Sequence, residues 1–288
     1  VTLRMISDIK GVKYTEGRLL PYFFPDVFCE GGNPIGEAQE NWLKARRAIL
    51  RSPLDRIGYG GYLKLAAESP GFIDEIQHVV NEFRLIHENM QGTKAYTAPF
   101  KVAILNSWGS LRRWMSNQVH HAIWHREIYS QVGVLECLSG MPFDVEFIDF
   151  NDVKNGIPED IKVIINVGSA YTAFSGAENW IDEKVVVRIR EFVDNGGGFI
   201  GVGEPTAYQF QGRYFQLWDV LGVDREMNFS ISTNKYNKLD DSHFILEDID
   251  RDIDFGEGTS QIYAYGENYQ ILNMDEEYSR LVINEYGR

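Results

Sequence analysis

Apolar and polar positions along the first ninety residues alternate in short segments that predict two strand–helix units. We expect strands at 12–15 and 56–59 and helices at 37–51 and 72–87. Helical spacing puts the apolar residues of the second helix on one face: Ile73, Ile76, Val79, Val80, Phe83 and Ile86. Two such units leave their strand edges open, so we expect the chain to continue before Val1 in the native protein.

From Lys101 onward the pattern predicts a separate, doubly wound domain. The predicted strands are 101–105, 144–148, 163–167 and 198–202, and the predicted helices are 111–138, 183–195 and 215–221, before a strand-rich acidic tail. Strands and helices that alternate at these lengths pair in parallel with right-handed crossovers. The fold class expected is α/β, with a boundary in the linker at 91–99 that separates residues 1–95 from residues 96–288.

Composition and charge narrow the classes of partner. The chain has 288 residues and no apolar run of membrane-spanning length, so we expect no membrane partner. The first 97 residues carry 12 acidic and 12 basic residues and are neutral, so the residues after Thr97 carry the whole net charge of −14. Phosphate backbones require clustered Lys and Arg, so we expect no nucleic-acid partner. The two cysteines, Cys29 and Cys137, have no metal or redox spacing, and a reducing cytoplasm is the expected location.

Two sequence patterns mimic known sites without their physical context. The glycines of Gly196–Gly201 have dinucleotide-motif spacing, but they end a predicted helix and begin a strand, so we interpret them as a helix stop. His120, His121 and His125 share part of the long predicted helix, yet the motif lacks the glutamate and third ligand of a zinc site. We expect a structural role for these histidines and no bound metal.

The segment Ile200–Gln209 lies where an amidotransferase-like domain turns sharply and exposes a nucleophilic Cys or Ser. Gly203 and Glu204 occupy that turn here. Without a thiol or hydroxyl, covalent glutaminase chemistry has no nucleophile. We therefore expect no chemistry from this domain and a capping or salt-bridge role for Glu204.

The loop Lys13–Phe28 (KYTEGRLLPYFFPDVF) concentrates aromatic and charged residues after the first strand. Aromatic rings stack on the apolar face of a sugar, and a guanidinium binds oxyanions at two points. Ligand sites of barrels lie at this end of the strands. The same residues could equally form a folded loop that plugs the barrel rim, and spacing alone leaves both interpretations open.

Several long runs resemble the 1,3-β-galactosyl-N-acetylhexosamine phosphorylases, which are the galacto-N-biose/lacto-N-biose phosphorylases of glycoside hydrolase family 112. The runs are GVKYTEGRLLPYFFPD, KARRAILRSPLDRIGYGGYL, VAILNSWGSLRRWMSNQVHHAIWHREIYS, LSGMPFDVEFIDF and GGGFIGVGEPTAYQFQGRYFQLWDVLGVD. The resemblance covers essentially the whole chain. It implies the last two βα units of a (β/α)8 barrel, followed by a glutamine-amidotransferase-like parallel-sheet domain.

The resemblance also implies an inverting phosphorolysis of lacto-N-biose or galacto-N-biose, with inorganic phosphate as co-substrate and no cofactor. Arg18 and Tyr22 match family residues that line the galactose and phosphate subsite, and Phe24 matches one beside the N-acetylhexosamine. We add Glu16 as a further substrate-binding candidate. The family's general acid lies on an earlier barrel strand, upstream of Val1, so the 288 residues alone are expected to be inactive.

The family resemblance further suggests a homodimer. Two alternatives to a phosphorylase remain at this point. One is a β-galactosidase-type hydrolase, which requires a second carboxylate beside a residue such as Glu16. The other is a non-catalytic oligomerisation module built on the α/β domain and its long helix, which carries Trp114 and Trp124.

Overall fold

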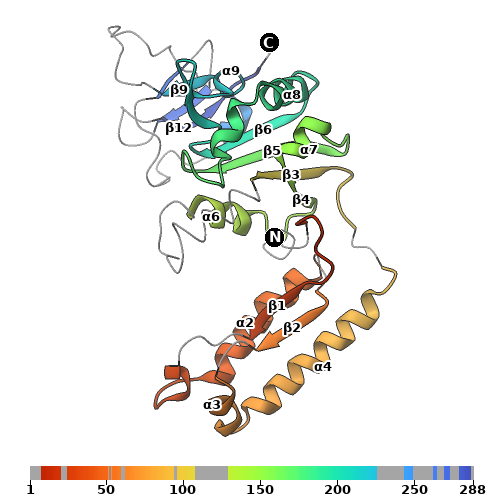
Figure 1. The fold of residues 1–288 in the computed structure, drawn as a ribbon. Helices are drawn as coiled ribbons and strands as arrows, with labels where there is room; N and C mark the ends of the chain where they lie inside the picture. Colours follow the sequence, from red (N-terminus) through yellow and green to blue (C-terminus); the bar gives the residue numbers. More distant parts are fainter. Residues whose placement is uncertain are drawn as a thin grey trace. The chain divides into compact units, whose positions relative to one another are not determined.

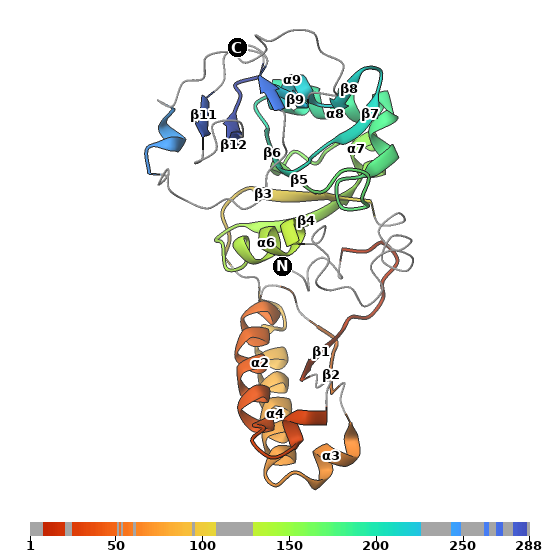
Figure 2. The same ribbon diagram turned by 90° about the vertical axis from the view of Figure 1, so that its left-hand side faces the viewer.

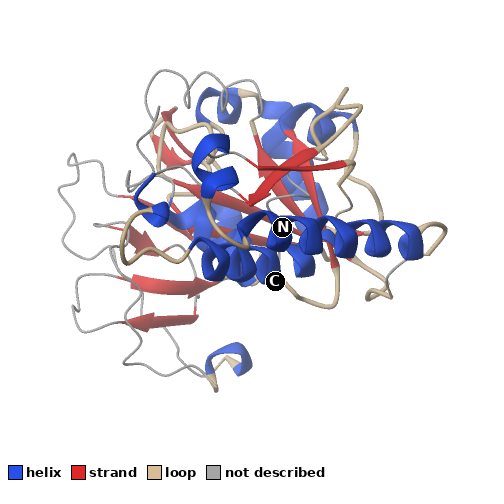
Figure 3. Cartoon of the chain, turned by 90° about the horizontal axis from the view of Figure 1, so that it is seen from below, coloured by secondary structure: helices blue, strands red, loops and turns tan. Residues whose placement is uncertain are grey.

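The computed structural model describes residues 8–20, 25–50, 52, 54–59, 62–93, 96–107, 129–225, 243–248, 262–264, 269–272 and 279–286. The chain divides into two compact units, residues 1–98 with 135–144 and residues 99–134 with 145–288. Figure 1 follows the elements along the chain, and Figure 3 shows the helices and strands of both units. The domain boundary expected between residues 95 and 96 stays a prediction.

The first unit is built from two strand–helix units. Its elements are β1 (Glu16–Leu20), η1 (Pro25–Phe28), α2 (Pro34–Ile49), β2 (Arg56–Tyr59), α3 (Leu63–Glu68) and α4 (Phe72–Met90). β1 pairs in parallel with β2, and α2 forms the connection between them. The predicted second strand and both long helices are confirmed.

The first strand was predicted four residues too early. Within the predicted strand at 12–15, the side chains of Val12 and Tyr14 are both exposed to solvent, Tyr14 by 78%. Pairing with β2 begins only at Glu16, opposite Arg56. The strand therefore takes in Glu16 and Arg18, which the sequence placed in the loop.

Helices α2 and α4 form the core of the first unit. Asn33 caps α2 by accepting a hydrogen bond from the backbone N–H of Gly36 at 2.9 Å, and Pro34 fills the first turn. The two helices lie side by side and cover one face of the β1–β2 sheet (Figure 2). Their buried residues form one cluster: Ala38, Trp42, Ala45, Ile49, Leu54, Ala66, Phe72 and Val79.

The second unit contains a four-stranded sheet in the order β4-β3-β5-β6. Its strands are β3 (Lys101–Asn106), β4 (Asp144–Asp149), β5 (Ile161–Gly168) and β6 (Gly198–Gly203). β5 pairs in parallel with both β3 and β6. All four predicted strands are therefore confirmed within one or two residues at each end.

Helices on the sheet faces complete the α/β architecture. α7 (Phe150–Asn155) and α8 (Glu183–Asp194) pack on one face through a core that includes Val153, Val185 and Ile189. The start of α6 (Tyr129–Cys137) lies on the opposite face (Figures 1 and 2). α6 is the described part of the helix predicted at 111–138. Gly196 ends α8 with a left-handed φ of 92° and Gly198 begins β6, so the glycine run is a helix stop, as expected.

After β6 the structure departs from the prediction. An antiparallel hairpin, β7 (Ala207–Phe210) with β8 (Arg213–Phe215), precedes a short helix, α9 (Trp218–Leu221). The helix predicted at 215–221 is therefore wrong at its start, because Phe215 lies in β8.

The tail holds η4 (Phe244–Leu246) and the strands β9 (Val223–Arg225), β10 (Ile262–Ala264), β11 (Tyr269–Leu272) and β12 (Ser279–Ile283). β9 pairs with β10 and β11 with β12, both antiparallel, so the tail is strand-rich as expected. η3 (Ala177–Ile181) completes the elements.

A buried amide connects β5 to the loops that follow β5 and β6. The Asn166 side chain is fully buried; its Nδ2 donates to the Ser175 carbonyl at 3.0 Å and its Oδ1 accepts from the Thr206 N–H at 2.8 Å. Because this amide satisfies buried backbone groups of two different loops, it determines how both loops leave the sheet.

We expect Asn166→Ala to lower the free energy of unfolding by about 3 kcal/mol, because the Thr206 N–H is then buried without an acceptor. Urea unfolding followed by tryptophan fluorescence measures the change. Asn195→Ala is the matched control, since the Asn195 side chain is exposed and bonds only the Glu191 carbonyl. Equal effects of the two substitutions would show that the buried amide has no special structural role.

The first unit contains a carboxylate whose ionised form stabilises the fold. Glu82 accepts hydrogen bonds from Trp42 Nε1 and from Arg46 Nη1 at 2.6 Å, and these two bonds lower the pKa of its carboxyl. Because the folded pKa lies below the unfolded value of about 4.3, this stabilisation is complete above that value and disappears as the pH falls through the folded pKa.

We therefore expect Glu82→Gln to cost roughly 1–2 kcal/mol at neutral pH and progressively less on acidification below about pH 4. Denaturation curves of both proteins between neutral and acid pH measure this difference. Glu88→Gln changes an exposed carboxylate on the same helix and should follow the wild-type curve. A Glu82→Gln cost that does not change with pH would rule out the ionised carboxylate as its source.

Candidate functional site

Of the four predicted substrate residues, Glu16 and Arg18 lie in β1, and the other two lie outside the described residues. Arg18 is the third residue of β1, and only its backbone is described. Tyr22 and Phe24 lie outside the described residues. Between Gly17 and Leu20 the pairing of β1 with β2 shifts by one residue, so Arg18 and Leu19 lie in a local irregularity of the strand. Irregularities of this kind commonly occur beside binding sites, where they change the direction of a side chain.

Glu16 lies at the other end of β1 from the expected site. It is the first residue of the strand and stands opposite Arg56, the first residue of β2. Its Oε2 is 3.7 Å from Arg56 Nη1; the Arg56 side chain is largely exposed to solvent and the Glu16 side chain about half exposed. Its expected position at the carboxyl end of the strand is therefore wrong. Its role in substrate binding stays a prediction that the strand geometry does not support, because barrel sites lie at the carboxyl ends.

The amino ends of β1 and β2 are joined by a structural contact. Asp55 Oδ2 accepts from the Thr15 N–H at 2.7 Å and from the Thr15 hydroxyl at 3.2 Å. The backbone hydrogen bond from Thr15 is the main reason that the Asp55 pKa is lowered. This contact aligns the two strands, so their carboxyl ends, Leu20 and Tyr59, open on the same edge of the sheet.

In the second unit, the turn after β6 contains a carboxylate that is fully engaged. Glu204 Oε1 accepts from the Tyr214 hydroxyl at 2.8 Å and from Arg225 Nη1 at 2.9 Å, while Oε2 accepts from the Ala170 N–H at 3.0 Å. Burial is the main cause of the raised Tyr214 pKa, and Glu204 adds to it, so the phenol stays protonated and donates. Glu204 therefore has the salt-bridge role expected from the sequence.

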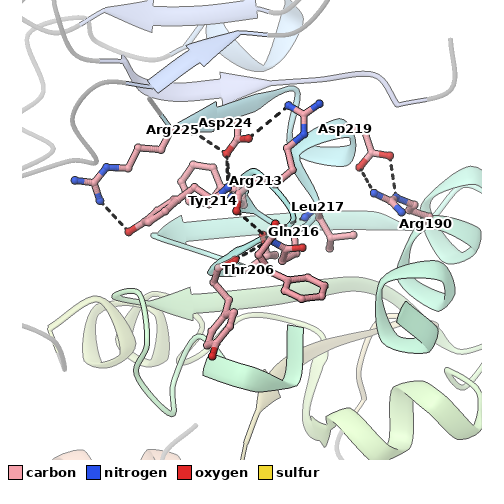
Figure 4. A network of polar contacts seen from close by, with 12 residues as sticks. Arg190, Thr206, Arg213, Tyr214, Gln216, Leu217, Asp219, Asp224 and Arg225 are labelled. Carbon is pink, nitrogen blue, oxygen red and sulfur yellow. Dashed lines mark hydrogen bonds and ion pairs between the residues drawn. The ribbon is translucent and has the colours of Figure 1, made fainter. Parts of the chain in front are cut away.

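A second carboxylate organises the hairpin and was not found from the sequence. Asp224 is fully buried, and its Oδ1 accepts from the backbone N–H groups of Tyr214, Phe215 and Arg225 at 2.8–3.1 Å. Figure 4 shows this network together with the ion pair of Arg190 and Asp219. Asp224 follows an αL glycine, Gly222. That Gly-x-Asp pattern is the only local signal, and it is too common to identify such a role.

The described residues offer no metal site, since they contain no group of three or more His, Cys, Asp or Glu side chains that could hold an ion. His120, His121 and His125 lie outside the described residues. In the described part of the chain, no helix has both the length and the apolar character needed to cross a bilayer.

Comparison with protein-family models assigns both parts of the chain. Residues 1–98 match the lacto-N-biose phosphorylase N-terminal TIM barrel domain, and residues 101–288 match the lacto-N-biose phosphorylase central domain. Together the two matches cover almost the whole chain.

Two curated relatives agree with these matches. A 1,3-β-galactosyl-N-acetylhexosamine phosphorylase of Lachnoclostridium phytofermentans is 58% identical over 99% of this chain and 40% of its own length. The enzyme of the same name from Bifidobacterium longum subsp. longum is 47% identical over 100% of this chain and 43% of its own length. The chain thus spans about two-fifths of the length of these relatives.

Among solved structures, Gan42B, a GH42 β-galactosidase from G. stearothermophilus, aligns with 68% of this chain and 29% of its own at 17% identity. Its TM-score is 0.40. The two family matches and the sequence identities, by contrast, extend over almost the whole of this chain. The chain belongs to the lacto-N-biose phosphorylase family.

Proposed function

We propose that the full-length protein containing this chain is a disaccharide phosphorylase, and hence a glycosyltransferase, that acts on β-1,3-galactosyl-N-acetylhexosamines. Inorganic phosphate attacks the anomeric carbon of galactose with inversion. The products are α-galactose 1-phosphate and N-acetylglucosamine or N-acetylgalactosamine. One observation carries this proposal: the whole of this chain is similar, at 58% and 47% identity, to about two-fifths of two enzymes named for this activity.

The proposed reaction needs few catalytic groups. An inverting glycosidase requires an acid for the leaving oxygen and a base that activates water. Phosphate is already an anionic nucleophile, so a phosphorylase requires only the acid together with cations that hold the phosphate. The bond from galactose C1 to the acceptor oxygen breaks, that oxygen takes the proton of the acid, and a phosphate oxygen bonds to C1. We place the acid upstream of Val1, and the reaction uses no cofactor.

In this scheme Arg18 and Tyr22 contact galactose and phosphate, and Phe24 contacts the N-acetylhexosamine. The strand position of Arg18 supports this assignment, because β1 pairs in parallel with β2 as barrel strands do and its register shifts at Arg18–Leu19. A guanidinium suits a phosphate oxyanion because its planar fork donates two parallel hydrogen bonds. Glu16 is retained only as a weaker candidate.

We further propose that the protein is a cytoplasmic homodimer whose partners are the disaccharide and phosphate. The net charge of −14 argues against a nucleic-acid partner, and the two exposed cysteines are compatible with a reducing compartment.

We expect the 288-residue chain alone to release no galactose 1-phosphate from lacto-N-biose, because the proposed acid lies upstream of Val1, outside these residues. The assay measures phosphate-dependent product formation, with the full-length protein as the active control. Turnover by the 288-residue chain would show that the acid lies within it. Phosphate-independent release of galactose by the full-length protein would instead identify a hydrolase.

In the full-length protein, Arg18→Lys should raise KM for phosphate roughly ten-fold while the KM for the disaccharide changes less, because lysine cannot form the two-point contact. Initial rates at varied phosphate concentration measure the effect. Arg47→Lys, at an exposed position of α2, is the matched control and should change neither constant. Unaltered phosphate kinetics in Arg18→Lys would exclude Arg18 from the phosphate subsite.

A further inference from the structure

A cavity of about 370 Å³ lies entirely within the second unit, outside the proposed barrel site. It opens between α8 and the tip of the β7–β8 hairpin, with η3 and the start of α9 at its sides. This volume lies in the range of small-molecule sites in proteins. The residues that line it include Glu183 and Arg190 of α8, Gln211 and Arg213 of the hairpin, and Trp218 of α9.

The hairpin wall of this cavity is held by hydrogen bonds from Gln216, a half-buried residue that itself lines the cavity. Gln216 Nε2 donates to the carbonyls of Tyr208, Phe210 and Arg213, at 2.7, 3.3 and 3.2 Å. The Gln216 N–H donates to the Thr206 carbonyl, and Thr206 in turn donates to Asn166 in the sheet. Figure 4 shows part of this connection. The wall is therefore fixed before any ligand arrives, which lowers the entropic cost of binding.

Two guanidinium groups face the cavity, and both are already oriented by other side chains. Arg213 lies over the Trp218 ring, 4.0 Å from its centroid, and is 3.6 Å from the buried Asp224. Arg190 contacts Asp219 through Nε at 2.8 Å and Nη2 at 3.0 Å. Asp224 largely compensates the charge of Arg213, and Asp219 that of Arg190. The two arginines therefore supply directed N–H donors with little net positive charge.

The rim supplies polar groups that the fold does not use. Among the described residues, neither the Glu183 carboxylate nor the Gln211 amide has a hydrogen-bond or ion-pair partner. Gln211 also has a left-handed φ of 49°, where a glycine would be relaxed. Gln211 and Gly212, with φ of 77°, are the two central residues of the β7–β8 turn, and a two-residue hairpin turn of this kind requires a positive φ at both, so the turn places the Gln211 side chain at the rim.

We propose that this cavity binds a neutral saccharide of one or two rings. Sugar hydroxyls both donate and accept, and the lining offers donors (Arg190 and Arg213), an acceptor (Glu183) and an amide that does both (Gln211). Trp180, Phe210 and Trp218 contribute apolar surface for the carbon skeleton. The proposal concerns the second unit alone and does not depend on the phosphorylase activity.

The charge balance distinguishes this ligand from an ionic one. Two carboxylates compensate the arginines, and Glu183 adds an uncompensated negative charge, which disfavours a phosphate or carboxylate ligand. The same balance gives a cation little attraction, because the one remaining carboxylate, Glu183, is exposed to solvent at the rim. A neutral ligand with many hydroxyls is disfavoured on neither ground.

The test uses the ¹⁵N-labelled 288-residue chain and the indole N–H signal of Trp218, assigned with the variant Trp218→Phe. We expect D-galactose or N-acetyl-D-glucosamine, added to about 50 mM, to shift this signal in a saturable manner. The Trp42 signal, from the first unit, should not move with it. Inorganic phosphate is the anionic probe and should leave the Trp218 signal unchanged.

Variants then assign the effect to the cavity. Glu183→Gln and Gln211→Gly should each weaken sugar binding roughly five-fold, as expected for the loss of one hydrogen bond. Gln211→Gly should also fold at least as stably as the wild type, because glycine relieves the left-handed position. Glu178→Gln, a carboxylate of η3 outside the cavity, is the matched control.

Three results would overturn the proposal. The first is an unshifted Trp218 signal with both sugars. The second is a shift with phosphate alone, which would identify an anion site. The third is sugar binding that both Glu183→Gln and Gln211→Gly leave unchanged, which would place the sugar elsewhere on the chain. None of these outcomes depends on whether the full-length protein is a phosphorylase.

Discussion

The buried amide of Asn166 is the contact on which the second unit depends. The strands of a parallel sheet pair their backbone N–H and C=O groups with one another. The irregular loops at the carboxyl edge of the sheet need other hydrogen-bond partners for theirs. Asn166 supplies them for the loop at Ser175 and the turn at Thr206 together. The position of that turn determines where the β7–β8 hairpin begins, and with it the positions of Gln216 and the cavity wall. The Asn166 side chain therefore connects the interior of the sheet to the surface beside α8.

Local patterns predicted the regular part of this fold. In the four-stranded sheet and in helices α2, α4 and α8, the apolar residues follow the spacing typical of a strand or a helix. The sequence alone is sufficient to predict such segments. The hairpin after β6 has no such pattern. Phe215, Leu217, Trp218 and Leu221 mimic a helical stripe. Phe215 instead pairs with Ala207 of β7, and Asp224, nine residues later, accepts its N–H. A strand organised by a distant buried carboxylate cannot be found from periodicity.

The candidate substrate site divides in the same way. Family resemblance names Arg18, Tyr22 and Phe24, but it does not supply the geometry, and a four-residue error in the strand was enough to misplace Glu16. The register of the strand decides whether Glu16 can reach the substrate. A residue at the amino end of a barrel strand is about 13 Å from the residue four positions later, at the carboxyl end. The pairing of Glu16 with Arg56 depends on β2, 40 residues away, so no local signal could reveal it.

Glu204, at the turn after β6, has a structural role in the second unit. A nucleophile at such a turn needs an unhindered atom and a nearby base. Glu204 instead directs both oxygens into the fold, toward Tyr214, Arg225 and the Ala170 N–H. Freeing this carboxylate for chemistry would leave those donors unpaired, at a cost of more than one hydrogen bond. The polar groups that the fold leaves available, Glu183 and Gln211, lie instead at the α8 cavity, where a ligand can use them without disturbing the sheet.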